Sequence, residues 1–115
     1  MKETFFLPVT FYKTASGSDP VADWFRALAK EDRRRVGLDL LRVQENWPVG
    51  MPVCKSLGRG LWEVRTTLRD HTAARVLFFV GNGEICVVHG FVKKAQTTPK
   101  HELELAHRRM KEMKP

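Results

Sequence analysis

The stretch from Lys55 to Lys94 decides the fold. It begins Lys55-Ser-Leu-Gly58 and Leu61-Trp-Glu-Val-Arg65, continues with Arg75 inside an apolar run, and ends His89-Gly-Phe-Val-Lys-Lys94. Short alternating segments of this kind, separated by turn residues, are typical of β-strands. The stretch therefore predicts a sheet that carries cationic side chains.

Parity within each strand predicts which of these side chains lie together. Successive side chains of a strand point to opposite faces, so residues of equal parity share a face. Glu63 and Arg65 are expected to point together, and so are His89, Phe91 and Lys93. Arginine, lysine and histidine gathered beside an aromatic ring form a surface suited to a phosphodiester backbone.

Three consecutive strands are predicted, at about Leu57 to Thr67, Ala73 to Val80 and Glu84 to Lys93. Gly81-Asn82-Gly83 is a strong signal for a tight turn between the last two strands. Arg69-Asp70-His71 is expected to form a looser turn between the first two. The three strands should form an antiparallel meander.

The segments on either side complete an α+β pattern. Phe5 to Lys13 alternates as a strand, and Pro8 favours an edge position because proline cannot donate to a ladder. Asp19-Pro20 predicts the start of a first helix, a second should begin near Glu31 and end before Pro48, and Thr98-Pro99 should open the last. The predicted order is strand, helix, helix, three-strand meander, helix, in a single domain of residues 1–115.

Size and charge limit the possible functions. The chain has 115 residues, of which 43% are hydrophobic, a net charge of +7 and an isoelectric point near 9.9. Its apolar runs are too short for a membrane helix or a signal peptide, so a cytoplasmic protein is expected. Cys54 and Cys86 are expected to be reduced thiols. A small domain this basic binds nucleic acid, an acidic protein or an anionic membrane surface, and composition does not choose among them.

Each candidate side chain also has a structural interpretation. Arg65 and Arg75 can be solvated cross-strand residues, although an arginine within the wholly apolar run around Arg75 is unusual. His89 can be a packed histidine held by a hydrogen bond, or a general base whose pKa is lowered by neighbouring lysines. Trp62 is expected in the core. Arg33-Arg34-Arg35 fits a solvated helix face better than a nucleic-acid stripe.

A metal site and a phosphate loop are not expected. Cys86 and His89, three residues apart on a strand, should point to opposite faces, and His101 and His107, six apart on a helix, do not converge. Gly58-Arg-Gly60 lacks the strand-to-helix context of a phosphate-binding loop. No cofactor is predicted.

With these motifs in order, the chain resembles toxins of the RelE/ParE superfamily, and within it the HigB-like, phage-derived branch. The resemblance spans nearly the whole chain and is carried by the motifs quoted above together with Ala74-Arg-Val-Leu-Phe78, Thr98-Pro99 and Glu102 to Arg109. It implies a small α+β fold and a ribosome-dependent mRNA endonuclease of a type II toxin–antitoxin system. It also implies cleavage through the RNA 2′-hydroxyl without a metal. It further implies that a helix-turn-helix antitoxin neutralises the toxin, and that the toxin contacts operator DNA only through this antitoxin.

Carried over by motif, the resemblance assigns a set of candidate residues. The catalytic candidates are Lys55, Arg65, Arg75, His89 and Lys93, and the RNA-binding candidates are Trp62, Phe91, Lys94 and Arg109. Lys55 and His89 are alternative bases, and the two arginines are expected to hold the phosphate. Phe91 stands where some relatives have tyrosine or histidine, so proton transfer by a tyrosine is not expected there. The alternative function is a ParE-like toxin that inhibits DNA gyrase without catalysis.

Overall fold

The structure, a computed structural model, describes residues 6–94 and 97–114. Its elements are, in chain order, β1 (Val9–Phe11), α1 (Pro20–Ala27), α2 (Lys30–Asn46), β2 (Cys54–Gly58), β3 (Leu61–Thr67), β4 (Ala73–Gly81), β5 (Glu84–Lys93) and α3 (Lys100–Met113). The five strands form one sheet in the order β1-β5-β4-β3-β2. The predicted α+β class is confirmed. Within the described residues, no helix is both long and apolar enough to cross a membrane.

The predicted three-strand meander is wrong in its first strand, because residues 57–67 form two strands and not one. The chain reverses at Gly58, Arg59 and Gly60, whose φ angles are 90°, 56° and 82°. Glycine adopts positive φ without strain, so two glycines around one residue permit a reversal within three positions. β2 pairs antiparallel with β3 on the far side of this turn. The meander therefore contains four strands.

The first strand is shorter than predicted, and it pairs in parallel with its neighbour. β1 covers only three residues and runs parallel to β5, so the sheet is mixed. Pro8 precedes β1, and its carbonyl oxygen accepts a hydrogen bond from the Ile85 amide at 2.8 Å. The expected edge position is confirmed. Phe5, the start of the predicted strand, lies outside the described residues.

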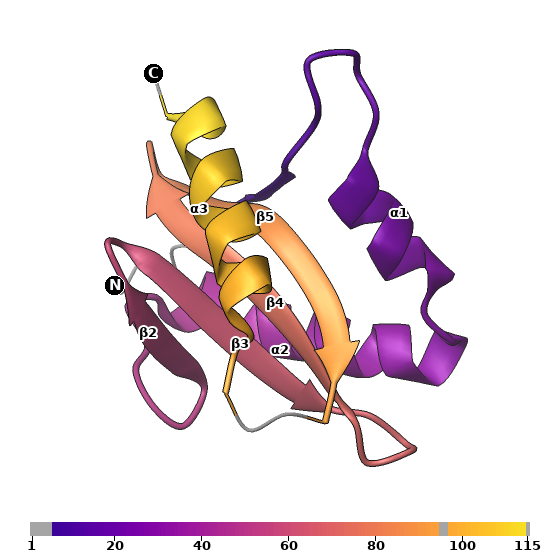
Figure 1. Cartoon of the computed structure of the whole chain (residues 1–115). Helices are drawn as coiled ribbons and strands as arrows, with labels where there is room; N and C mark the ends of the chain where they lie inside the picture. Colours follow the sequence, from indigo (N-terminus) through magenta and orange to yellow (C-terminus); the bar gives the residue numbers. More distant parts are fainter. Residues whose placement is uncertain (1–5, 95–96, 115) are drawn as a thin grey trace.

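The sheet is covered on both faces (Figure 1). Helices α1 and α2 lie against one face, and α3 crosses the other. The first core contains Val36, Leu40 and Val43 of α2 packed against the sheet, with Trp47 meeting the rings of Trp62 and Phe78 edge-on at 5.2 and 5.6 Å. The apolar residues of α2 thus follow the helical spacing of three and four and face the sheet.

The second core lies under α3. Ala106 and Met110 of α3 are buried against Leu61, Leu77 and Phe79 of the sheet. Strand β4 is therefore buried on both faces, and every residue from 74 to 79 is buried. A strand of this kind has a continuous apolar sequence because neither face meets water.

A β-bulge in β5 changes which residues share a face. Leu77 is opposite His89, while the next residue of β4, Phe78, is opposite Val87, so Val88 is an extra residue. Cys86, Val88 and Phe91 all belong to the core under α3, and His89 meets α3 side chains as well. The expectation that Cys86 and His89 point to opposite faces is wrong, because the extra residue reverses the alternation between them.

The helix starts match the predicted positions but not every predicted contact. α1 begins at Pro20, but Asp19 makes no side-chain cap and instead lies 3.8 Å from the Lys13 ammonium. In α3, the carboxylate of Glu104 pairs with Lys100 at 3.9 Å.

Gly90 fixes the distance between α1 and the sheet. A Cβ atom built on Gly90 would lie 2.3 and 2.4 Å from two atoms of the Trp24 ring. We expect Gly90→Ala to lower the free energy of unfolding by about 1–3 kcal/mol or more, because the helix must move to admit the methyl group. Urea denaturation measures this change. Gly50→Ala, where a Cβ meets no atom within 4 Å, is the control, and equal effects of the two substitutions would contradict the packing.

Candidate active site

The strand register brings most of the predicted residues onto the face of the sheet that α3 covers. Residues directly opposite one another in neighbouring strands share a face. One cross-strand row contains Lys55, Glu63, Leu77 and His89; the next contains Arg65, Arg75 and Phe91; the third contains Thr67, Ala73 and Lys93. Side chains from four strands that are separate in the sequence are thus neighbours.

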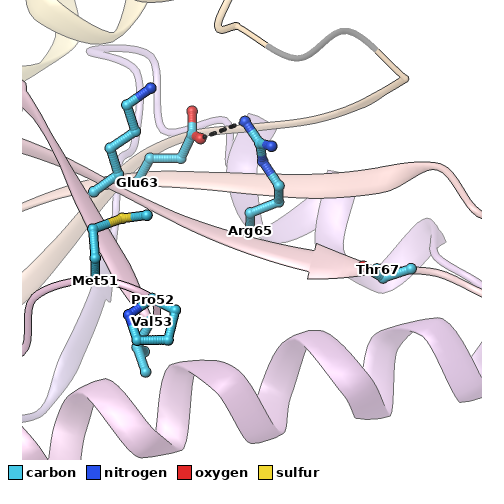
Figure 2. A pocket seen from close by; sticks show the side chains of 7 residues that line it. Met51, Pro52, Val53, Glu63, Arg65 and Thr67 are labelled. Carbon is cyan, nitrogen blue, oxygen red and sulfur yellow. Dashed lines mark ion pairs between the residues drawn. The ribbon is translucent and has the colours of Figure 1, made fainter.

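A cavity of about 530 Å³ opens at the end of these rows near β2. Its polar lining comes from Lys55, Glu63 and Arg65, and its apolar wall comes from Met51 to Val53, the loop before β2. Figure 2 shows Glu63 and Arg65 side by side on β3, with Met51, Pro52 and Val53 on the neighbouring wall. The volume lies within the range of about 300–1,000 Å³ that is usual for small-ligand sites.

Glu63 is the main site residue that the sequence analysis treated only as a neighbour of Arg65. Its side chain is 2% exposed, lies 3.6 Å from the Arg65 guanidinium and accepts a hydrogen bond from the Thr98 hydroxyl. Thr98 stands just before α3, so this contact joins the C-terminal segment to β3. The sequence contained a signal for this role. Glu63 and Arg65 share one face of their strand, while Trp62 and Val64 make the other face apolar.

Arg75 lies deeper than predicted. Its side chain is 0% exposed, and its Nε and one terminal nitrogen have no hydrogen-bond partner among the described residues. Burial lowers the pKa of the Arg75 guanidinium, nearby Arg65 lowers it further, and Glu63 opposes both effects. Direct contact of Arg75 with a ligand is therefore absent in this arrangement. The buried charge of Arg75 is held directly across from Arg65 on the neighbouring strand.

His89 is held between β5 and α3. Its Nε2 lies 3.1 Å from a carboxylate oxygen of Glu102, and its Nδ1 lies 3.5 Å from a guanidinium nitrogen of Arg109. Burial is the largest cause of the lowered pKa of His89; Glu102 raises this pKa, and Arg109 lowers it. The expected direction is the same, but the predicted cause, neighbouring lysines, is not among the causes found.

These contacts define the state of the His89 ring. In the neutral ring, Nε2–H donates to Glu102 and the lone pair of Nδ1 faces Arg109, which can only donate. The Phe91 ring packs against it with centroids 5.4 Å apart. Both nitrogens are therefore engaged by α3, and the ring is placed as a connection between sheet and helix and not as a free base.

Arg109, predicted to bind RNA, is engaged inside the molecule. It donates to the Val88 carbonyl oxygen at 3.0 Å and lies 4.9 Å above the Tyr12 ring. The Tyr12 hydroxyl in turn donates to Glu112 at 2.6 Å, and this hydrogen bond is the largest cause of the raised pKa of Tyr12. Arg109 thus joins α3 to Val88 in the bulge of β5 and to Tyr12, the residue that follows β1.

The remaining candidates divide between the two faces. Trp62 lies on the opposite face, against Trp47, so it does not share the surface of the cationic residues. Phe91 is on the expected face but only 7% exposed. Lys93 and Lys94 are exposed at the end of β5. Of the four RNA-binding candidates, only Lys94 is openly accessible.

Metal-ligating and thiol groups are not assembled in the part of the chain that the structure describes. No three His, Cys, Asp or Glu side chains come together there as a metal ion would require. Burial raises the pKa of the Cys54 thiol to about 11, and burial also raises that of Cys86. Thiols in this state are poor nucleophiles.

Comparison with protein families agrees with this geometry. Residues 23–111 match the family model described as phage derived protein Gp49-like (DUF891). The match covers the C-terminal part of α1, all of α2 and every strand of the sheet except β1. The chain belongs to this family. Gp49-like proteins are a toxin-like family of toxin–antitoxin systems. None of the curated proteins matches the chain.

The match gives the antitoxin prediction its support. A Gp49-like toxin implies an antitoxin partner. The matched range begins at Asp23 and ends at Lys111, so it includes every predicted site residue from Lys55 to Arg109. The family model therefore covers the segment that forms the cavity and the contacts between α3 and the sheet.

His89 makes stability depend on pH. Its pKa is lowered in the folded chain, so the unfolded chain binds the proton more readily below the unperturbed value of about 6.5. We expect the melting temperature to fall as pH decreases from 7 to 5, and to fall less steeply in His89→Gln. Thermal melts at matched ionic strength test this. His101→Gln, at an exposed position, is the control; equal slopes for wild type and His89→Gln would contradict the assignment.

Arg75 places a charge in the interior at a cost to stability. Replacing even a buried ion pair with apolar side chains of similar volume is often neutral or stabilising by about 1–4 kcal/mol, and a buried charge whose nitrogens lack hydrogen-bond partners has less to lose. We expect Arg75→Met to raise the melting temperature by several degrees. Two of the guanidinium nitrogens of Arg75 have no hydrogen-bond partner among the described residues, so the substitution loses no hydrogen bond from them. Leu77→Met, equally buried on the same strand, is the control. A fall in melting temperature larger than that of the control would show that the guanidinium is well satisfied.

Proposed function

We propose that this chain is the toxin of a type II toxin–antitoxin system, and that it stops translation as a ribosome-dependent mRNA endonuclease. The observation that carries the proposal is the cavity lined by Lys55 and Arg65, with the buried charge of Arg75 directly across from Arg65 on the next strand. Two cations at one opening, with a third charge buried close by, suit the binding of a phosphodiester. Membership of a toxin-like family supports the same function.

The reaction follows from the chemistry of RNA. The 2′-hydroxyl oxygen attacks the adjacent phosphorus, its proton passes to a base, and the bond from phosphorus to the 5′-oxygen breaks. The leaving oxygen takes a proton, so the products are a 2′,3′-cyclic phosphate and a 5′-hydroxyl. This route needs a proton acceptor, a proton donor and positive charge at the phosphoryl oxygens, but no co-reactant.

Lys55 is the base that the geometry favours. Its exposed side chain lines the cavity, whereas both ring nitrogens of His89 are engaged by Glu102 and Arg109. In its unprotonated form the Lys55 amine accepts the hydroxyl proton, a step worth about 10²–10⁴-fold in rate. In this proposal Lys93, which shares the face of Arg65 one row further along the sheet, donates the proton to the leaving oxygen.

Arg65 and Arg75 have different electrostatic roles in this proposal. Arg65 is partly exposed and can hold two phosphoryl oxygens through its planar fork, with Glu63 fixing its orientation at 3.6 Å. Arg75 lies directly across from Arg65 and adds a fixed positive charge below it. A charge that is already in place does not have to reorganise when negative charge develops on the phosphate.

The test is cleavage of messages after brief induction of the chain, mapped by primer extension. We expect Arg65→Ala to reduce cleavage about 10²–10³-fold, because one phosphate contact made in the transition state is lost. Lys55→Ala should reduce it by a similar or larger factor. Arg42→Ala is the matched control, since Arg42 is also paired with a carboxylate, Asp39 at 3.3 Å, but lies on α2.

Two outcomes would reject the proposal. Growth arrest with intact messages would exclude RNA cleavage as the cause of toxicity. A DNA-damage response that persists in Lys55→Ala and His89→Ala would instead indicate the non-catalytic inhibition of DNA gyrase. Circular dichroism of each variant separates loss of activity from loss of fold.

A further inference from the structure

The positive charge of the chain is distributed unevenly. Residues 19–46, which contain α1 and α2, carry six basic and six acidic side chains, so this segment contributes nothing to the net charge of +7. Several of its arginines are paired with carboxylates on the same helix: Arg26 with Asp23, Arg34 and Arg35 with Glu31, and Arg42 with Asp39. The excess charge belongs to the rest of the chain.

Part of this excess forms a series of cations beside α3. Lys55 and Arg59 are exposed on β2 and in the turn that follows it, and Lys111 is exposed on the last turn of α3. None of the three forms an ion pair with a carboxylate of the described residues within 4.0 Å. Lys55 is near the start of β2, and Arg59 is in the turn at its other end.

The turn after β2 lies close to the C-terminal half of α3. Burial is the largest cause of the lowered pKa of His107 on α3, and the charges of Arg59 and Lys111 lower it further. Lys114 lies near the same turn, because its ammonium is 4.0 Å from the position that a Cβ atom on Gly60 would occupy. The turn after β2 and the C-terminal half of α3 therefore form one cationic surface; Figure 1 shows this hairpin beside α3.

We infer that the RNA strand continues from the cavity along this surface, with one phosphate held at Lys55 and further phosphates held between Arg59 and Lys111. The inference rests on the proposed function, because the cavity is taken as the place of cleavage. It extends the site by roughly the length of β2. The contacts are to phosphates, so the surface holds RNA without regard to sequence.

The chemistry of the surface favours RNA over an acidic protein segment. Protein interfaces have an apolar or aromatic centre and are depleted in lysine. The exposed large apolar side chains Phe6 and Leu38 lie elsewhere, before β1 and on α2, while Met51 borders the cavity. Exposed cations on β2, in the turn after it and on α3, without an apolar side chain between them, suit the backbone of a single-stranded RNA.

The test is the salt dependence of RNA binding. The probe is a short, fluorescent, fully 2′-O-methylated single-stranded RNA, which the proposed reaction does not cleave, bound to the full chain. Each phosphate contact on a single strand contributes about 0.7 to the slope of log K against log salt. We expect the double variant Arg59→Gln/Lys111→Gln to reduce this slope by about 1.4.

The matched control is the double variant Arg34→Gln/Arg42→Gln, which removes the same charge from exposed positions on α2. It should leave the slope unchanged. Equal reduction in both double variants would show that only the overall charge matters and would overturn the inference. An unchanged slope in Arg59→Gln/Lys111→Gln would overturn it as well, as would tighter binding of polyglutamate than of RNA by the wild type.

A second measurement reports on the place of binding. Neutralising Arg59 and Lys111 with phosphates removes two of the causes that lower the pKa of His107. NMR titration of the histidine ring protons should therefore show this pKa rise when the RNA is added, with the signal assigned through His107→Gln. An unchanged His107 pKa in the bound state would place the RNA elsewhere.

The two proposals can fail separately. If messages are cut but the slope is unaffected by Arg59→Gln/Lys111→Gln, the extended surface is wrong and the endonuclease stands. If the slope and the His107 pKa change as expected but no message is cut on the ribosome, the surface binds RNA and the endonuclease is wrong.

Discussion

The burial of β4 on both faces is the constraint on which the rest of the structure depends. Ala74, Val76 and Phe78 belong to the core with α2, and Leu77 and Phe79 belong to the core with α3. β4 pairs antiparallel with β3 and β5, and β2 pairs antiparallel with β3. The register of these four strands brings Lys55, Arg65 and His89 into adjacent rows. If α3 were absent, Leu77 and Phe79 would face water. The same helix therefore completes the core and borders the cationic face.

Local patterns were sufficient to predict the helices, the last two strands and the shared face of Glu63 and Arg65. Each of these depends on residues close in sequence: the apolar spacing of α2, the Gly81-Asn82-Gly83 turn, and alternation within β3. Alternation also placed Trp62 correctly in the core. Arg65 and Arg75 lie opposite each other because the pairing of β3 with β4 contains no bulge, so side chains alternate regularly between the two faces along both strands.

The features that sequence did not reveal depend on contacts between distant segments. The bulge at Val88 is defined by pairing with β4, and it alone brings His89 beside Cys86 on the face of α3. The parallel pairing of β1 with β5 joins opposite ends of the chain. The burial of Arg75 and of Glu63 depends on where α3 lies, which no periodicity within either strand encodes.

The contact of α3 with the sheet has two halves with opposite energetics. Toward its C-terminus, Ala106 and Met110 bury apolar surface against Leu61, and each such side chain contributes on the order of 1–3 kcal/mol. Toward its N-terminus, Thr98, just before the helix, donates a hydrogen bond to the buried carboxylate of Glu63, and a buried charge is costly to desolvate. The apolar half of the contact therefore stabilises a polar contact that would not form by itself, and α3 is the element that joins the two.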